Sequence, residues 1–154
     1  MSVKTPLKLE GIITIRLIDK KSGKTVYEKK VKNAVLSPLA QHICGTLAGD
    51  NNYPLVPIYL VSLYDAGDNH IKDLSPPTTL EHRGYSDHWD VHAVFRDTSS
   101  DEYTVARVDL VASGTVNGGT YTYNIARQRN LNVAKTADQV LVVDWVINVP
   151  FQAA

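Results

Sequence analysis

The feature that most constrains the fold is a pair of long β-patterned runs near the two ends of the sequence. The first covers residues 7–19 and the second covers residues 139–149. The second run is apolar at nearly every position, which is typical of a strand that packs against neighbours on both faces. Because sequences that open and close with such runs usually pair them, we expect both strands in one sheet.

Turn signals divide much of the remaining sequence into further strands. Apolar marks in a strand-like pattern occur in residues 25–32, 58–64, 88–96, 103–112 and 120–127. In the third of these, we expect Trp89, Val91, Ala93 and Phe95 to face inward. Asn117-Gly118-Gly119 predicts a tight hairpin turn, since two consecutive residues there tolerate positive φ.

The spacing of these turns is that of a sandwich rather than of alternating β/α units. At 154 residues the sequence has the length of one domain. We therefore predict a mainly β fold in a single domain over residues 1–154. It would be an antiparallel, jelly-roll-like β-sandwich of about seven or eight strands with one packed helix.

One segment has helical periodicity. Ser37-Pro38 is a typical helix start, with the serine as N-cap, and Gly49 is a typical stop. Between them, Leu39, Ile43 and Leu47 recur at helical spacing, so we expect them to pack on the sheet. Leu47→Ala should then cost about 2–5 kcal/mol.

The composition limits the partners. Sixteen basic and sixteen acidic residues cancel, which argues against nucleic acid or a membrane as the main partner. A neutral chain also lacks the repulsion that keeps copies apart.

Cys44 is the only cysteine, and we expect it to be a buried, inert thiol. Residues 1–7 contain no apolar run of the signal-peptide type, so synthesis in a cytoplasm is expected.

Two polar clusters have the residue types of metal sites. His88, Asp90 and His92 share one face of a strand beside Asp87, but neighbours would stand about 7 Å apart. That spacing is wide for one ion, so we expect these side chains in solvent or in a subunit contact.

The second cluster lies in residues 65–79, which lack periodicity and predict a long exposed loop. Asp65, Asp68, Asn69 and Asp73 carry oxygen ligands suited to calcium, but their spacing does not fit an EF-hand. The loop would either contact another subunit or be a solvated connection. Neither cluster predicts a metal or a cofactor.

Asp144 is the carboxylate that most needs a partner, because valines and Trp145 surround it in sequence. We expect a structural ion pair with Arg107, Arg127 or Arg129. No paired catalytic carboxylates, nucleophile elbow or phosphate loop is recognisable in the sequence, which favours a protein that is not an enzyme.

Tyrosine, which is enriched at protein interfaces, is spread over strands and loops. Tyr121 and Tyr123 share one strand face and would either contact a neighbour or cap the core. The residues expected at subunit contacts are Tyr64, Asp65, Asp68, His70, Tyr85, His88, Tyr121 and Tyr123. Alternatively, Tyr85, His88 and Trp89 would form a platform that binds a carbohydrate or a receptor.

The order of several short motifs carries a resemblance. The motifs are Val31-Lys32-Asn33-Ala34-Val35-Leu36, Ile58-Tyr59-Leu60-Val61-Ser62-Leu63, Thr78-Thr79-Leu80-Glu81-His82-Arg83, Val91-His92-Ala93-Val94-Phe95 and Val143-Asp144-Trp145-Val146-Ile147. Taken in order, they resemble small virion structural proteins of tailed bacteriophages and related archaeal viruses.

That resemblance implies a capsid decoration, turret or tail component located in the virion. It also implies assembly with copies of itself, a trimer being favoured, and with a major capsid or tail protein. Neither nucleic acid nor a membrane is expected as a partner.

Overall fold

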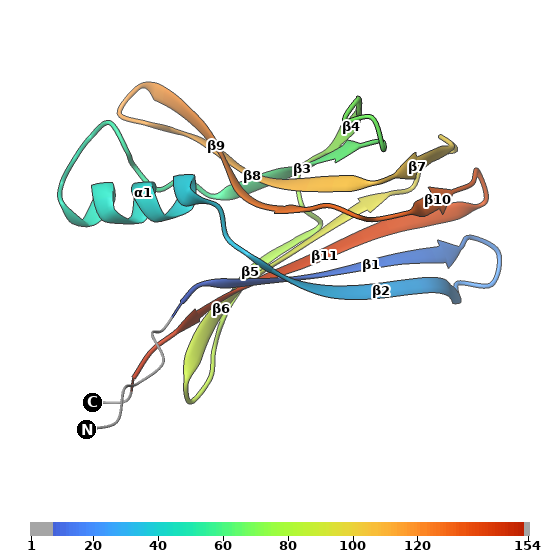
Figure 1. The fold of residues 1–154 in the computed structure, drawn as a ribbon, viewed down its shortest axis with the longest axis horizontal. Helices are drawn as coiled ribbons and strands as arrows, with labels where there is room; N and C mark the ends of the chain where they lie inside the picture. Colours follow the sequence, from blue (N-terminus) through green and yellow to red (C-terminus); the bar gives the residue numbers. More distant parts are fainter. Residues whose placement is uncertain (1–7, 153–154) are drawn as a thin grey trace.

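The computed structural model describes residues 8–152 and contains one helix and eleven strands in that range (Figure 1). The elements are β1 (Glu10–Asp19), β2 (Thr25–Ala34), α1 (Ser37–Leu47), β3 (Ile58–Tyr64), β4 (His70–Leu74), β5 (Thr79–Gly84), β6 (His88–Asp97), β7 (Tyr103–Val105), β8 (Arg107–Val116), β9 (Gly119–Gln128), β10 (Val133–Lys135) and β11 (Gln139–Pro150). The prediction of a mainly β, antiparallel sandwich with one helix is confirmed.

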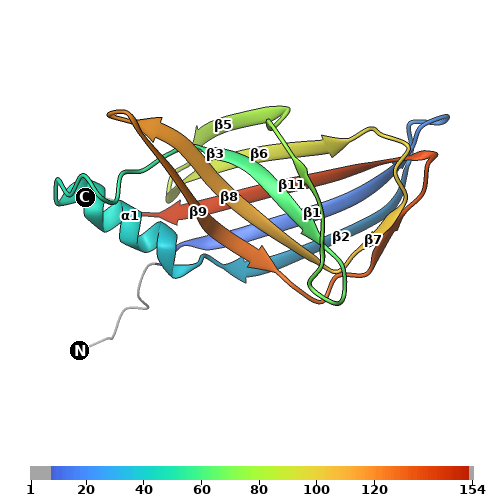
Figure 2. The same ribbon diagram turned by 90° about the horizontal axis from the view of Figure 1, so that it is seen from above.

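The strands form two packed sheets. Sheet A has the order β2-β1-β11-β6-β5, and sheet B has the order β4-β3-β8-β9, with β7 and β10 as a separate short pair. The expected pairing of the first and last long strands is confirmed, since β1 and β11 are antiparallel neighbours from Glu10–Asn148 to Asp19–Gln139. Figure 1 shows that the sheets diverge toward the end that carries α1, which we call the helix end. Figure 2 shows the strands of sheet B crossing those of sheet A at an angle.

The core lies between the two sheets. Trp145 of β11 and Phe95 of β6 are its largest apolar side chains, and both are fully buried. Alternate residues of β1, Ile13 and Ile15, face Val61 and Leu110 of sheet B in the same cluster. The period of two in these strands therefore builds the core as the sequence predicted.

One side of the sandwich is joined and the other is not. Past the end of β2, Val35 forms a bridge with Ala126 of β9, and the Leu36 N–H donates to the Ile125 carbonyl at 2.7 Å. The Asn33 side chain also bonds Gln128 across the sheets. On the opposite side, β5 pairs with β6 alone within residues 8–152.

Several local predictions need correction. Residues 65–79 are not one long loop, because β4 pairs with β3 there and buries Leu74. The short strands β5 and β10 were also not predicted, and residues 103–112 fall into two strands. Short strands with mixed side chains give a weak periodic signal, so whether they form depends on pairing with longer neighbouring strands. The hairpin turn at Asn117-Gly118 is confirmed, with φ of 50° and 81°.

The prediction that Leu47 packs on the sheet is wrong, since 83% of this side chain is exposed. The helix lies at the end of the sandwich, and its side-chain packing against the strands comes from Leu39, His42 and Ile43 in the preceding turns. Its last turn extends beyond the sheets. Cys44 is exposed for the same reason rather than buried. The N-cap is Leu36 without a side-chain bond, so Ser37 is the first helical residue and not the cap.

Two further expectations fail at the surface of sheet A. Trp89 lies on the inward side of β6 but is 50% exposed, because the strand runs past the edge of sheet B at the helix end. No layer formed by residues 8–152 packs over the outer face of β11. Val142 is buried there between Arg16 and Arg96 of the neighbouring strands, whereas Val140 and Val146 are half-buried.

The predicted start of the first strand at Leu7 lies outside the described residues. Within residues 8–152, the helix α1 is too short to cross a bilayer.

Candidate functional site

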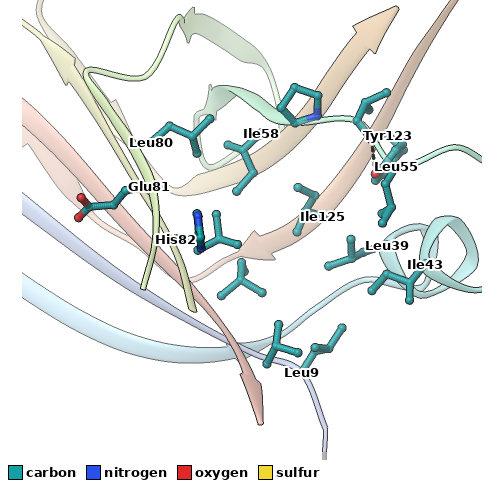
Figure 3. Close-up of a pocket in the computed structure, with 15 residues that line it drawn as sticks. Leu9, Leu39, Ile43, Leu55, Ile58, Leu80, Glu81, His82, Tyr123 and Ile125 are labelled. Carbon is teal, nitrogen blue, oxygen red and sulfur yellow. Dashed lines mark hydrogen bonds between the residues drawn. The ribbon is translucent and has the colours of Figure 1, made fainter. Parts of the chain in front are cut away.

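A cavity of about 440 Å³ opens at the helix end, between the diverging sheets (Figure 3). It is lined by Leu9, Leu39, Ile43, Leu55, Val56, Pro57, Ile58, Leu80, Glu81, His82, Val91, Tyr123, Ile125, Ile147 and Val149. His82 of β5 and the Tyr123 hydroxyl are the polar exceptions, and the carboxylate of the neighbouring Glu81 points away from the cavity (Figure 3). A cavity of this size and chemistry accepts apolar groups.

The rim of the cavity continues as an exposed apolar surface. Within residues 8–152, nine large apolar side chains are exposed, and Val26 is the one that lies at the other end of the sandwich. The remaining eight lie on elements at the helix end, and Leu55, Leu80 and Val149 among them line the cavity. We call this set the apolar end: Leu47, Leu55, Tyr59, Leu80, Tyr85, Trp89, Val149 and Phe151. Concentration of such residues in one place marks a binding surface more strongly than the same number scattered singly.

The β5–β6 hairpin carries the aromatic part of this surface. Tyr85 stacks on His88 with ring centres 4.4 Å apart, and Trp89 stacks on His82 at 5.6 Å. The Trp89 ring lies across Gly84, where a Cβ atom would be 2.9 Å from the ring. The missing side chain at Gly84 therefore allows the tryptophan to lie against β5.

Tyr121 and Tyr123 lie at the same end but have structural contacts. The Tyr121 hydroxyl donates to the Asn51 carbonyl at 3.1 Å, and the Tyr123 hydroxyl accepts from the Val56 N–H at 3.4 Å. Tyr123 also stacks on His42 of α1 at 3.8 Å, and burial raises its pKa. The two side chains thus hold the loop after α1 in place, which corresponds to the core-capping alternative.

His42 completes this attachment of the helix. Its Nδ1 lies 2.6 Å from the Pro54 carbonyl, which can only accept, so Nδ1 carries the proton. The Thr46 hydroxyl accepts from the Leu55 N–H at 2.9 Å. Together these bonds fix α1 and residues 54–55 as one wall of the cavity.

Four of the predicted interface residues lie elsewhere, on the outer face of sheet B. Asp68 accepts from Arg107 at 3.1 Å and from Arg129 at 2.9 Å, and these bonds hold its pKa below the usual range. The Arg107 guanidinium also lies 3.8 Å from the centre of the Tyr64 ring. At the centre of this cluster, Asp109 is only 1% exposed and binds both Arg107 and Arg127.

His70 and Asp65 flank this arginine cluster. His70 lies against Tyr64 and 2.7 Å from Asp73. Asp65 accepts from the Gly67 and Asn69 N–H groups, both at 2.9 Å, and these bonds lower its pKa. Asp65 therefore shapes the turn that carries Asp68 to the arginines.

The outer face of sheet A carries a second polar network. Asp144 is paired as expected, but its partners are His92 at 2.8 Å and Arg16 at 3.6 Å rather than the predicted arginines, which lie on sheet B and beside it. His92 also contacts Glu81 at 3.1 Å. Next to this network, Asp90 is buried and accepts two 2.9 Å bonds from Arg83.

These contacts separate the residues that had the types of a metal site. His88 contacts Asp87 and Tyr85, while His92 and Asp90 have the partners named above. Among residues 8–152, no three histidine, cysteine or acidic side chains come together in a way that would hold a metal ion.

The predicted contact residues thus fall into three places: the arginine cluster (Tyr64 and Asp68, flanked by Asp65 and His70), the hairpin (Tyr85, His88) and the loop support (Tyr121, Tyr123). The sequence prediction missed Leu55, Leu80 and Val149, which form the cavity rim. The sequence shows that Val149 alternates with the buried residues of β11. It does not show that β11 extends beyond the elements that pack against it.

No protein-family model matches this chain, and searches of curated proteins and of solved structures gave no match.

Proposed function

We propose that this protein is a non-enzymatic structural component of a virus particle that docks through its apolar end. It would assemble with copies of itself and with a larger capsid or tail protein. The observation that carries the proposal is the gathering of eight of the nine large exposed apolar side chains at the helix end.

Two physical arguments support docking there. Binding of a partner that covers water-exposed apolar side chains around an open apolar cavity is favourable, because it removes apolar surface from water. The formal net charge of zero adds no long-range repulsion between copies. The fold alone is compatible with many functions. The virion assignment therefore rests on the sequence resemblance, and the docking surface rests on the structure.

Analytical ultracentrifugation tests the proposal, with the full chain alone and mixed with the products of adjacent genes. We expect the chain to sediment in an oligomer or a mixed complex. Val149→Asp should weaken that association by about tenfold or more, because it places a charge on the cavity rim. Val26→Asp is the matched control, since Val26 is also an exposed valine (56%, against 42% for Val149) but lies at the other end. A chain that remains monomeric in every mixture, or equal effects of the two substitutions, would contradict the proposal.

A second function is supported by the hairpin aromatics. Trp89 presents a half-exposed ring that is held flat over Gly84, and flat exposed rings are suited to stacking on the apolar face of a sugar. A glycan-binding screen of the protein and of Trp89→Ala tests this alternative, with Tyr59→Ala as an exposed aromatic control. A carbohydrate-binding protein would lose its hits in the first variant alone.

A further inference from the structure

The edge of sheet A at β5 has backbone groups without a partner strand. The Tyr85 N–H donates to the His88 carbonyl at 2.9 Å, which makes these two residues a hydrogen-bonded pair of the hairpin. Because such pairs alternate along an antiparallel ladder, the backbone groups of Leu80, His82 and Gly84 point away from β6. Within residues 8–152, β6 is the one strand that pairs with β5.

The opposite edge of sheet A, at β2, is protected in ways that β5 is not. The edge strand β2 carries Lys29, Lys30 and Lys32, and its end is bridged to β9. On β5, Glu81 and Arg83 already have partners within their own sheet, and the strand contains neither lysine nor proline. An edge of this kind is open to strand addition.

We propose that two copies of this chain pair through β5, with the two strands antiparallel and related by a two-fold axis at His82. This inference rests on the proposed function, in which copies of the chain assemble, and it identifies the strand through which they contact each other. In this register His82 lies opposite the second copy's His82, and Leu80 lies opposite Gly84. The two five-stranded sheets then become one continuous sheet. The contact is isologous, as two-fold interfaces are.

Charge complementarity selects both the second copy and this register. With His82 on the axis, Glu81 of each copy faces Arg83 of the other on the outer side of the sheet. A shift of one step in either direction places Glu81 opposite Glu81 or Arg83 opposite Arg83. Opposite charges across antiparallel strands stabilise the pair, and like charges destabilise it.

The same register covers exposed apolar side chains on the inner side of the sheet. Leu80 is 44% exposed, and the residue opposite it would be Gly84, over which the Trp89 ring lies. Leu80 of each copy therefore meets the Trp89 ring of the other. The pairing removes both side chains from water while it satisfies the free backbone groups.

Disulfide trapping in the full chain tests the register, in a Cys44→Ala background that removes the exposed native thiol. Opposite residues of a hydrogen-bonded pair have Cα atoms about 5.5 Å apart, within the range that a disulfide spans. We expect His82→Cys to form a covalent dimer on mild oxidation. Leu80→Cys is the matched control, because the two copies of position 80 would lie roughly 13 Å apart along the strands.

Several outcomes separate the hypotheses. Rapid crosslinking of His82→Cys, with at least about tenfold slower crosslinking of Leu80→Cys, supports the β5 contact. Equal rates for the two variants, or no covalent dimer from His82→Cys while circular dichroism shows both folded, would overturn it. If the chain still enters complexes with adjacent gene products but His82→Cys does not crosslink, the proposed function stands and the β5 contact fails. A chain that is monomeric in every mixture refutes both.

Discussion

Asp109 provides a direct test of how the outer face of sheet B is stabilised. The substitution Asp109→Asn keeps the shape of the side chain but removes its charge and turns one acceptor into a donor. Four hydrogen bonds are affected, from Arg107 at 3.1 and 2.9 Å and from Arg127 at 2.8 and 3.0 Å. Both guanidinium groups then lose the carboxylate that neutralises them.

The size of the effect follows from burial. Removing one partner of a fully buried ion pair typically costs about 3–5 kcal/mol. The Arg107 side chain is 12% exposed and keeps Asp68 and Tyr64, while Arg127 is 31% exposed and can regain water. We therefore expect a loss of about 2–4 kcal/mol in the free energy of unfolding. Urea denaturation should show a midpoint lowered by roughly 1–2 M.

Asp68→Asn is the matched control, because Asp68 binds Arg107 too but is half exposed. Its effect on the free energy of unfolding should be much smaller. Equal losses in the two variants, or a loss below about 0.5 kcal/mol for Asp109→Asn, would refute the argument that burial decides the strength of this cluster.

The same carboxylate should make stability depend on pH. Burial alone would raise the pKa of Asp109, but hydrogen bonds from Arg127 and Arg107 outweigh it and lower the pKa. A lowered folded-state pKa means that the stabilisation is complete above the unfolded-state pKa of about 3.9 and is lost as pH falls through the folded value. Urea titrations between about pH 5 and 2 should show a steeper loss of stability in the wild type than in Asp109→Asn.

Three further substitutions test the packing. Leu47→Ala should change the free energy of unfolding by less than about 0.5 kcal/mol, whereas Ile43→Ala at the cavity should cost about 1–2 kcal/mol; the reverse order in urea denaturation would mean that the last helical turn is packed. Gly11→Ala should cost about 1–3 kcal/mol, because the new methyl group would collide with Asn33 Oδ1 and lie 3.0 Å from Trp145 Nε1. An unchanged melting temperature would show that Asn33 moves aside freely.

The long strands were predictable because their signal is local. Alternation in residues 10–19, 88–97 and 139–150 reports which face is buried wherever the other sheet actually covers the strand. The turn at Asn117-Gly118 was predictable for a similar reason, since two adjacent residues with positive φ leave few alternatives.

The predictions failed where the burial or the partner of a side chain depends on how the sheets are arranged and how far they extend. Leu47 and Trp89 have the periodicity of core residues, but they lie beyond the ends of the opposing elements. The partners of Asp144 depend on strand order and register, which bring His92 and Arg16 beside it and place the three predicted arginines elsewhere. The cavity and the open β5 edge likewise follow from the arrangement of the sheets and have no local sequence signal.

The position of β11 at the centre of sheet A has a consequence for how the chain folds. Its neighbours are β1, whose Glu10 pairs with Asn148, and β6, whose Asp90 pairs with the same residue. Until β11 is synthesised, the β1–β2 and β5–β6 hairpins of this sheet have no strand to join them. Contacts of such high sequence separation slow folding and prolong the exposure of apolar surface. Sheet A is therefore completed only after β11 leaves the ribosome, and truncations that remove it should yield insoluble chains rather than a smaller folded domain.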